Sequence, residues 1–216
     1  MEIYRNDRSP RNATGYSERR ERMKVLVACE FSGIVREAFK AKGHDAWSCD
    51  LLPTDISGNH IQGDVLEILD DGWDLMIAHP PCTYIANGGN NWLNRRPDLK
   101  WRENRELWAA FFMELINAPI ERIAVENPIG CMSTKYRKPD QIVHPYMFGH
   151  DIRKDTCLWL KNLPLLSPTN IVSPPYRKID YWSNKRNPNG RSLKSITYQG
   201  IANAMAEQWG DDNGTS

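Results

Sequence analysis

The sequence predicts an α/β protein whose mostly parallel sheet has helices on both faces. Along residues 23–209, short apolar segments typical of strands alternate with segments in which apolar residues recur at helical spacing. Such alternation indicates a parallel sheet, because each helix crosses the sheet and returns the chain to the next strand. With 216 residues, 40% of them hydrophobic and 25% charged, the chain has the size and composition of one globular domain.

Each predicted element has its own pattern. Residues 101–117 form a predicted amphipathic helix, because apolar side chains recur there at i, i+4 and i+8. Gly43 ends the first predicted helix, and a further strand segment is expected before Gly63. The predicted strands are 24–29, 44–49, 74–78, 122–125 and 157–160, and the other predicted helices are 33–42 and 196–209.

Both ends of the chain are predicted to be disordered. Residues 1–22 contain six arginines and almost no apolar side chains, so they cannot cover a core and are expected to form a basic arm. Residues 210–216 are polar or glycine and are expected to form a disordered tail. The folded domain is therefore predicted to occupy residues 23–209.

The composition narrows the class of protein. The sequence has no apolar run of the ~18 residues that a membrane-spanning helix needs and no secretory signal, so no membrane partner is expected. Its 5 cysteines occur singly, which favours reduced thiols in the cytoplasm over disulfides or a zinc ribbon, and no metal is expected. The net charge is only +1, so any contact with nucleic acid must come from local basic patches.

Polar residues follow several predicted strands, at the edge of the sheet where ligands bind in α/β proteins. Residues 30–34 open a helix after the first strand; Gly33 permits a tight turn, and the helix N-terminus favours a carboxylate or phosphate. The alternative is an ordinary strand-to-helix turn. Asp50 is placed to accept from ribose hydroxyls, and Asp64 is placed to accept from an adenine amino group. Each acid alone fits a solvated loop, but together they predict a nucleoside pocket.

Residues 79–84, His-Pro-Pro-Cys-Thr-Tyr, follow a buried predicted strand. The two prolines fix the backbone and remove hydrogen-bond donors, so they predict a rigid platform instead of a longer strand. Cys82 on that platform is a candidate nucleophile, and a small buried apolar residue is the alternative. Glu126 ends an apolar strand just before Pro128, which places it at the same edge as Cys82. Residues 87–100 are polar and basic, and predict either a mobile loop that closes over phosphates or a flexible crossover.

Taken in order, these segments resemble the cytosine-5 DNA methyltransferase family. Residues 30–34 resemble the family's first motif, Pro81-Cys82 its proline-cysteine nucleophile, and Glu126-Asn127 its glutamate-asparagine motif. Residues 149–160 stand where the family's basic motif follows, and residues 197–205 resemble its closing glycine-asparagine motif. Three features depart from the family pattern. Pro128 stands in place of valine, the closing motif reads Gly-Ile-Ala-Asn instead of Gly-Asn, and residues 164–193 are too few for a normal target-recognition domain.

The resemblance implies a Rossmann-like methyltransferase fold and methyl transfer from S-adenosylmethionine to carbon 5 of cytosine in DNA. It implies that the Cys82 thiolate attacks carbon 6 of a flipped cytosine, while Glu126, protonated or sharing a proton, donates to ring N3. Arg153 or Lys154 would hold the carbonyl oxygen of the base. The residues that the resemblance and the strand-end positions assign to the cofactor are Phe31, Ser32, Gly33, Ile34, Asp50, Leu51, Asp64, Val65, Pro81 and Asn203.

The short recognition region leaves several alternatives open. The expected partner is double-stranded or locally single-stranded DNA, with a protein partner or self-association supplying specificity. Residues 164–193 carry aromatic and basic side chains, which favour stacking and phosphate contacts over base readout and predict a short or relaxed target sequence. The other hypotheses are a different pyrimidine or RNA modifier on the same scaffold and an inactive nucleic-acid-binding decoy.

Overall fold

Seven strands form one mixed sheet in the computed structural model, which describes residues 22–89, 99–173 and 195–210. The strands are β1 (Lys24–Ala28), β2 (Asp45–Asp50), β3 (His60–Gln62), β4 (Leu75–Ala78), β5 (Arg122–Asn127), β6 (Gln141–Val143) and β7 (Thr156–Lys161). The α-helices are α1 (Ile34–Ala41), α3 (Leu99–Ile116), α4 (Met132–Lys135) and α5 (Gln199–Gln208). Short 3-10 helices occupy Val65–Ile68 (η1), Asn87–Gly89 (η2) and Pro145–Met147 (η3).

The strands lie in the order β3-β2-β1-β4-β5-β7-β6. Neighbouring strands from β3 to β5 run parallel, and β7 is inserted antiparallel between β5 and β6. This order, with its one reversed strand, is that of the Rossmann-like methyltransferase fold, so the predicted fold class is confirmed. Ala28 pairs with Cys49 on one side and Ala78 on the other, which brings the carboxyl ends of three central strands to one edge.

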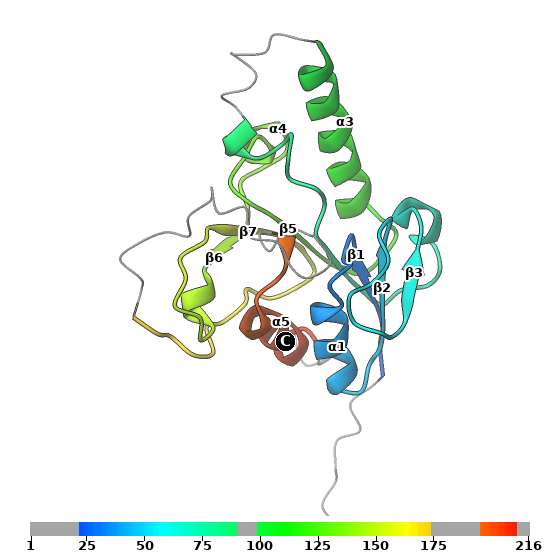
Figure 1. Ribbon diagram of the computed structural model, residues 1–216, viewed down its shortest axis with the longest axis vertical. Helices are drawn as coiled ribbons and strands as arrows, with labels where there is room; N and C mark the ends of the chain where they lie inside the picture. Colours follow the sequence, from blue (N-terminus) through cyan, green and yellow to red (C-terminus); the bar gives the residue numbers. More distant parts are fainter. Residues whose placement is uncertain (1–21, 90–98, 174–194, 211–216) are drawn as a thin grey trace, which may run out of the picture.

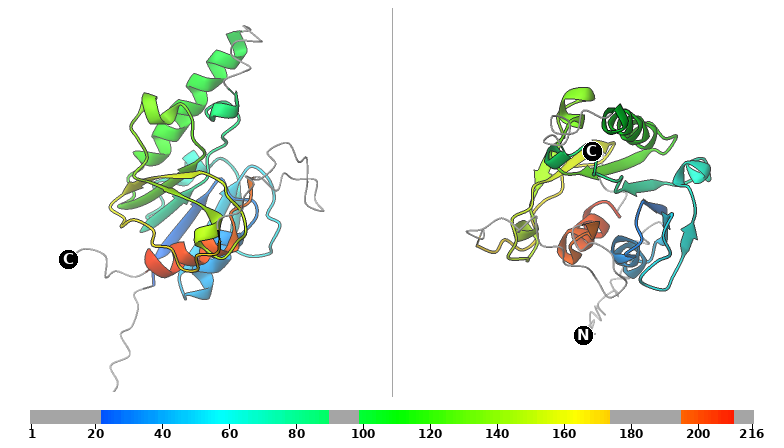
Figure 2. Two further views of the ribbon diagram at one scale, coloured as in Figure 1. Left: turned by 90° about the vertical axis from the view of Figure 1, so that its left-hand side faces the viewer. Right: turned by 45° about the horizontal axis from the view of Figure 1, so that its top comes forward.

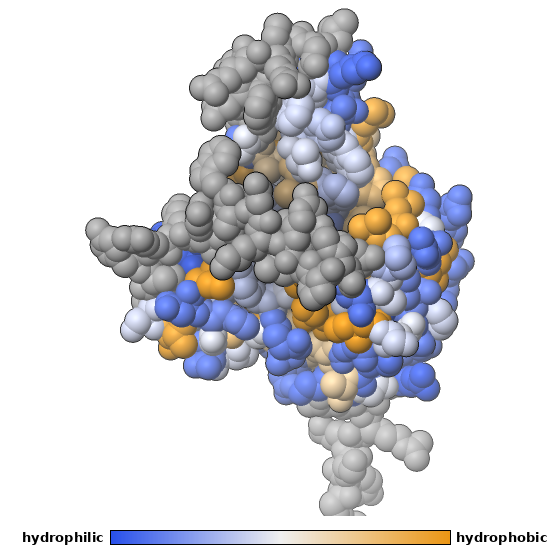
Figure 3. Space-filling view, viewed as in Figure 1, coloured by the Kyte–Doolittle hydropathy of each residue, from blue (hydrophilic) through white to orange (hydrophobic). Residues whose placement is uncertain are grey.

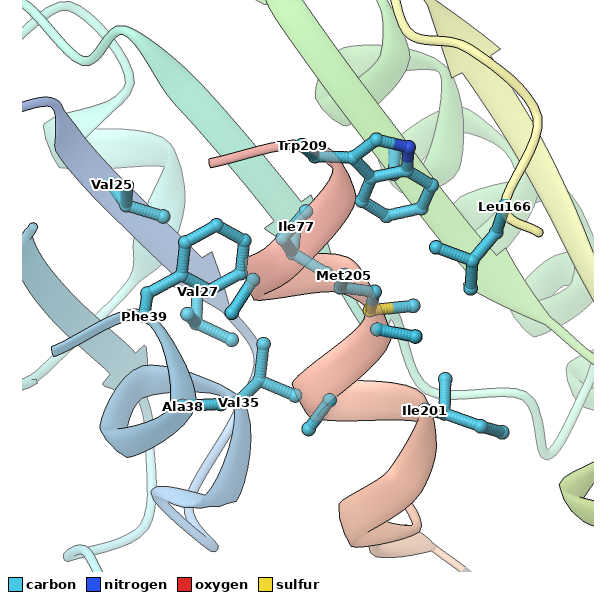
Figure 4. Close-up of a cluster of buried hydrophobic side chains, with 14 of the residues drawn as sticks. Val25, Val27, Val35, Ala38, Phe39, Ile77, Leu166, Ile201, Met205 and Trp209 are labelled. Carbon is cyan, nitrogen blue, oxygen red and sulfur yellow. The ribbon is translucent and has the colours of Figure 1, made fainter. Parts of the chain in front are cut away.

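Helices cover both faces of the sheet (Figure 1, Figure 2). Helices α1 and α5 pack side by side on one face, and α3 packs on the other and extends beyond the sheet. Successive side chains of β1 point to opposite faces of the sheet. Val25 and Val27 belong to the hydrophobic cluster that contains Phe39 and Met205 (Figure 4), whereas Leu26 belongs to the hydrophobic cluster beneath α3. A central strand buried on both faces therefore reads as an uninterrupted apolar run.

The predicted elements agree with the structure except at their ends and in the shortest segments. The last helix begins at Gln199 instead of residue 196, and β6 and α4, of 3 and 4 residues, were not predicted. Leu107, expected on the buried face of its helix, is 66% exposed. The predicted arm and tail lie, apart from Arg22 and Gly210, outside the described residues. In the described parts of the chain, no helix is both long and apolar enough to cross a membrane.

A fully buried arginine fixes the loop between β2 and β3. Arg36 on α1 has no exposed surface, and a buried guanidinium is stable only when its donors find acceptors. Its acceptors are the Glu37 carboxylate, the Ser48 and Thr54 hydroxyls and the Ile56 carbonyl. The loop 51–59 is therefore tied to α1.

Replacing Arg36 by methionine is expected to lower the free energy of unfolding by about 3–5 kcal/mol, the usual result of removing one partner from a buried charge network. Urea denaturation followed by tryptophan fluorescence measures this change. Lys40→Met, on the same helix but partly exposed, is the matched control and is expected to cost less than about 1 kcal/mol. Equal losses in the two variants would contradict the assigned role of Arg36.

Candidate active site

A cavity of about 410 Å³ opens at the carboxyl-terminal edge of the sheet, next to α3. This volume lies within the roughly 300–1,000 Å³ of typical small-molecule and cofactor sites. Asp50 and Asp64 give it two carboxylates, and α3 contributes Trp108 and Phe111, whose ring centroids are 5.5 Å apart. Figure 3 shows hydrophobic surface beside the lower part of α3. The cavity can therefore accept a ligand with both polar hydroxyl or amino groups and an apolar ring.

Half of the predicted cofactor-binding residues line this cavity: Asp50, Leu51, Asp64, Val65 and Pro81. Residues 31–33 lie in the turn between β1 and α1, and Ile34 begins α1; none of these four residues lines the cavity. Asn203 is exposed on α5, on the opposite face of the sheet from α3, so the structure does not bring it to the cavity. The roles of 31–34 and Asn203 in cofactor binding remain predictions.

The turn after β1 is built by a buried carboxylate. Glu30 is 4% exposed and accepts hydrogen bonds from the Val35 and Arg36 amides, at 2.8 and 3.2 Å, and from the Ser32 hydroxyl, at 3.0 Å. Gly33 adopts φ +76, and a Cβ there would lie 2.7 Å from the Arg36 guanidinium. The glycine is therefore required both by its backbone conformation and by the close approach of Arg36.

The two cavity carboxylates are each oriented by a backbone amide two residues further along the chain. Oδ1 of Asp50 accepts from the Leu52 amide at 2.9 Å, and Oδ1 of Asp64 accepts from the Leu66 amide at 3.0 Å. Asp64 thereby caps the first turn of η1. Because each bond occupies one oxygen and holds the carboxylate in place, these acids are ordered before any ligand binds.

Several cavity residues were not predicted. Helix α3 contributes Asn104 and Leu107 beside its two aromatic residues, and Cys29 and Cys49 line the cavity from the strand ends. The apolar positions of α3 extend over more of its surface than burial against the sheet requires, as the exposure of Leu107 shows. The sequence signal for a ligand-facing helix was therefore an apolar stripe that is wider than contact with the core requires.

Cys82 differs from the buried cysteines in its exposure to solvent. Cys82 is exposed at the edge of the sheet, whereas Cys49 and Cys157 are buried. Burial, followed by the charge of Asp50, raises the pKa of Cys49 to about 11, and burial with the charge of Glu126 raises the pKa of Cys157 to about 12. Burial also raises the pKa of Cys29 far above its usual range. These three thiols stay protonated at neutral pH and are poor nucleophiles.

Cys82 stands on a platform that neighbouring elements hold in place. The buried Asn127 side chain at the end of β5 donates to the Pro80 carbonyl at 2.8 Å. The Cys82 carbonyl accepts from the Ile85 and Ala86 amides, and Arg105 of α3 donates to the Tyr84 carbonyl at 2.9 Å. The predicted rigid platform is therefore present, and Asn127 supplies a tie that the prolines alone did not predict.

Glu126 lies beside this platform in a charged environment. Burial by itself raises the pKa of Glu126, but the hydrogen bond with His79 and the charges of Lys154 and His79 outweigh it and hold that pKa below its ordinary value. Nδ1 of His79 is 3.3 Å from Oε2 of Glu126. Glu126 is therefore ionised at neutral pH.

The structure distinguishes the two candidate cations. Arg153 is exposed, whereas Lys154 is half-buried and close enough for its charge to lower the pKa of both Cys82 and Glu126. The Lys154 carbonyl lies 3.1 Å from Nδ1 of His144, which holds the backbone at the start of β7. Of the two residues, Lys154 is the one that the fold brings to Cys82 and Glu126.

The reactivity of Cys82 is expected to depend on these two neighbours with opposite signs. Although Cys82 is exposed at the sheet edge, desolvation by the protein around its sulfur, followed by the Glu126 charge, raises the pKa of Cys82, and the Lys154 charge lowers it. Glu126→Gln should therefore increase the rate at which iodoacetamide alkylates Cys82 at pH 8, and Lys154→Met should decrease it, because the thiolate is the reactive form. Peptide mass spectrometry measures the modification of Cys82 alone. A shift of both variants in the same direction would show that neither charge acts on the sulfur.

Some predicted features fall outside the described residues. Of the predicted basic loop 87–100, the structure describes η2 and the start of α3, and residues 90–98 lie outside the description. Of the predicted recognition region, residues 164–173 are described and 174–193 are not. Among the residues that are described, no group of three or more His, Cys, Asp or Glu side chains is arranged to hold a metal ion.

The similarity of this chain to known proteins lies among solved structures. No family profile matches the sequence, and no curated protein sequence matches it. Among solved structures, the chain is similar to a protein described as a DNA modification methyltransferase encoded within a prophage (E. coli), with a TM-score of 0.46 and 17% sequence identity over 71% of this chain. The chain spans about half, 53%, of the length of that protein. Its function is therefore inferred from the geometry of its own site.

Proposed function

We propose that the protein is an S-adenosylmethionine-dependent methyltransferase that modifies carbon 5 of cytosine in DNA, with Cys82 as the nucleophile. One observation carries the proposal. Cys82, the exposed thiol on the Pro80-Pro81 platform, stands beside Glu126 and Lys154, and Pro81 of the same platform lines the neighbouring cavity. A nucleophile, an acid–base group and a cation thus adjoin a separate ligand site, as transfer between two bound molecules requires.

The cavity residues fit S-adenosylmethionine. Asp50 and Asp64 would accept from the ribose hydroxyls and the adenine amino group, and the apolar surfaces of Leu51, Trp108 and Phe111 would contact the adenine ring. When bound, the cofactor supplies an electrophilic methyl group on a positively charged sulfur. The cavity's carboxylates, which Leu52 and Leu66 orient, suit a ligand with that positive charge.

The protein's own groups would act on the pyrimidine in a defined order. Cys82 loses its proton to solvent, with Lys154 favouring the thiolate, and its sulfur forms a bond to carbon 6 of a cytosine flipped from the stack. The displaced electron pair moves toward ring N3, which takes a proton that Glu126 relays from solvent. Carbon 5 then becomes nucleophilic. After methylation, N3 returns its proton to Glu126, and loss of the carbon 5 proton to a solvent water drives out the Cys82 thiolate.

Mass spectrometry of nucleosides from DNA incubated with the protein and S-adenosylmethionine tests the proposal directly. We expect 5-methylcytosine. Finding only methylated adenine or N4-methylcytosine would show that the thiol mechanism is wrong. DNA, RNA and free nucleotides should be assayed side by side, since the short recognition region also favours a pyrimidine or RNA modifier on the same scaffold.

Asp50→Asn is expected to weaken cofactor binding by about 10-fold. A hydrogen bond to a charged acceptor contributes roughly 1–1.5 kcal/mol more than one to a neutral acceptor, and asparagine retains an oxygen for the Leu52 amide. Titration calorimetry with S-adenosylhomocysteine measures the dissociation constant. Asp70→Asn, an exposed acid away from the cavity lining, is the matched control and should leave it unchanged. Unaltered affinity in the Asp50 variant would remove Asp50 from the binding site.

A further inference from the structure

The two loops that carry Cys82 and Glu126 touch each other at a second place, beyond the reacting groups. Ala86 lies four residues after Cys82, and Gly130 lies four residues after Glu126. Ala86 and Gly130 form an isolated antiparallel bridge. The mechanism above uses neither residue. The bridge therefore joins the loop of the nucleophile to the loop of the acid through a backbone contact that the chemistry alone does not require.

Two hydrogen bonds flank this bridge. The Asn87 amide donates to the Ile129 carbonyl at 2.9 Å, and the Cys131 amide donates to the Ile85 carbonyl at 2.8 Å. These four residues are the ends of two paired segments, which we term the clasp. Backbone groups alone make both bonds, and the bridged residues between them are a non-hydrogen-bonded antiparallel pair, the kind in which two strands approach most closely.

Gly130 is required by this close approach and not by its backbone conformation. Its φ lies outside the left-handed region. A Cβ on residue 130 would overlap the Ile85 carbonyl oxygen and would lie 2.8 Å from the Cα of Ala86. Both are backbone atoms, and Ile85 is itself buried, so no change of side-chain rotamer relieves the overlap. Any side chain at position 130 must therefore push the two segments of the clasp apart.

Resting on the proposed function, we propose that Gly130 is a positioning residue, and that the clasp it permits sets the distance between Cys82 and Glu126. The Cys82 carbonyl accepts from the amides of Ile85 and Ala86, at 3.2 and 2.9 Å. A shift of the clasp is therefore transmitted to the nucleophile within a single turn of the chain.

The clasp adds a second tie to the one that the platform already has. The first tie is the hydrogen bond that Asn127 donates to the Pro80 carbonyl at 2.8 Å. A single tie fixes one point and still allows the platform to rotate about it. The clasp fixes a second point on the other side of Cys82, and both ties lead back to the end of β5, which carries Glu126. The two reacting groups are thus held in place before a pyrimidine binds, as catalysis by orientation requires.

Gly130→Ala is expected to lower kcat for methyl transfer by about 10²-fold, the loss that a displacement of about 1 Å can cause. The dissociation constant of S-adenosylhomocysteine should stay close to wild type, because neither segment of the clasp lines the cofactor cavity. Single-turnover kinetics and titration calorimetry measure these two quantities. A wild-type kcat in the Gly130→Ala variant would overturn the inference.

A second measurement separates positioning from general destabilisation and needs neither DNA nor cofactor. Because the Glu126 charge raises the pKa of Cys82, Glu126→Gln should speed the alkylation of Cys82 by iodoacetamide. In the Gly130→Ala background the ratio of the two alkylation rates should fall toward unity, since the interaction between charges weakens with distance. Gly88→Ala is the matched control: a Cβ at Gly88 would meet no described atom within 4 Å, so that ratio should stay at its wild-type value.

Asn87→Pro keeps the inference testable if Gly130→Ala does not fold. It removes the amide that donates to the Ile129 carbonyl, and proline is tolerated in the first turn of a helix, where η2 begins. It too should lower the alkylation ratio, and a wild-type ratio in both variants would contradict the role of the clasp. If the wild-type protein methylates no pyrimidine while the ratio falls in Gly130→Ala, the proposed function fails and the positioning role of Gly130 stands.

Discussion

Replacing Cys82 by alanine is expected to reduce methylation to background and to abolish covalent trapping by DNA that contains 5-fluorocytosine. Fluorine at carbon 5 cannot leave as the proton does, so the wild-type enzyme should remain bonded to carbon 6 after methyl transfer. The exposed Cys82 is the thiol at the sheet edge, whereas burial raises the pKa of Cys157 to about 12 and keeps it protonated. Denaturing gel electrophoresis measures the adduct.

The control for this prediction is Cys131→Ala, since Cys131 is partly exposed and its side chain makes no cap hydrogen bond to α4, the short helix that it precedes. That variant should form the adduct at the wild-type rate. Cofactor binding by Cys82→Ala should also stay close to wild type, because Pro81, and not Cys82, lines the cavity. An adduct that persists without Cys82 would assign the nucleophile to another residue.

Replacing Glu126 by glutamine is expected to lower kcat by about 10²–10⁴-fold, the range for loss of a general acid–base group. Glutamine matches the shape of glutamate and can still hydrogen-bond to a base, but it cannot relay a proton to N3. Because the negative charge of Glu126 raises the pKa of Cys82, the same variant should have a more reactive thiol. Single-turnover kinetics with S-adenosylmethionine in excess measures the chemical step.

The combination of these two effects makes the prediction specific. A variant that is slower in methyl transfer but faster in alkylation by iodoacetamide has lost proton transfer and not the nucleophile. A variant that is slow in both would instead indicate a disturbed platform, since Asn127, the next residue, ties β5 to the Pro80 carbonyl. Asn127→Ala provides that comparison and is expected to slow both reactions.

The sequence by itself determined the fold class and the order of the chemical groups. Central strands such as β1 are buried on both faces and so read as continuous apolar runs, and the residues that follow them must lie at one edge of a parallel sheet. Local pattern therefore sufficed to place Asp50, Asp64, Cys82 and Glu126 at strand ends. Residues 157–160 were predicted as a strand, but their pattern did not show that β7 runs antiparallel to its neighbours. The short β6 was not predicted, because 3 residues are too few to show a period.

Only the tertiary structure decided which neighbours these groups have, because the contacts join residues far apart in the chain. Helix α3 closes the cavity with Trp108 and Phe111 because it packs across strands that are distant in sequence, which no local period records. The ionised state of Glu126 likewise depends on two residues that are distant in sequence. His79 lies 47 residues before Glu126, and Lys154 lies just before β7. The pKa of a side chain depends on its burial and on its distances to other charges. The sequence therefore sufficed to identify Glu126 as the acid but not to predict its protonation state.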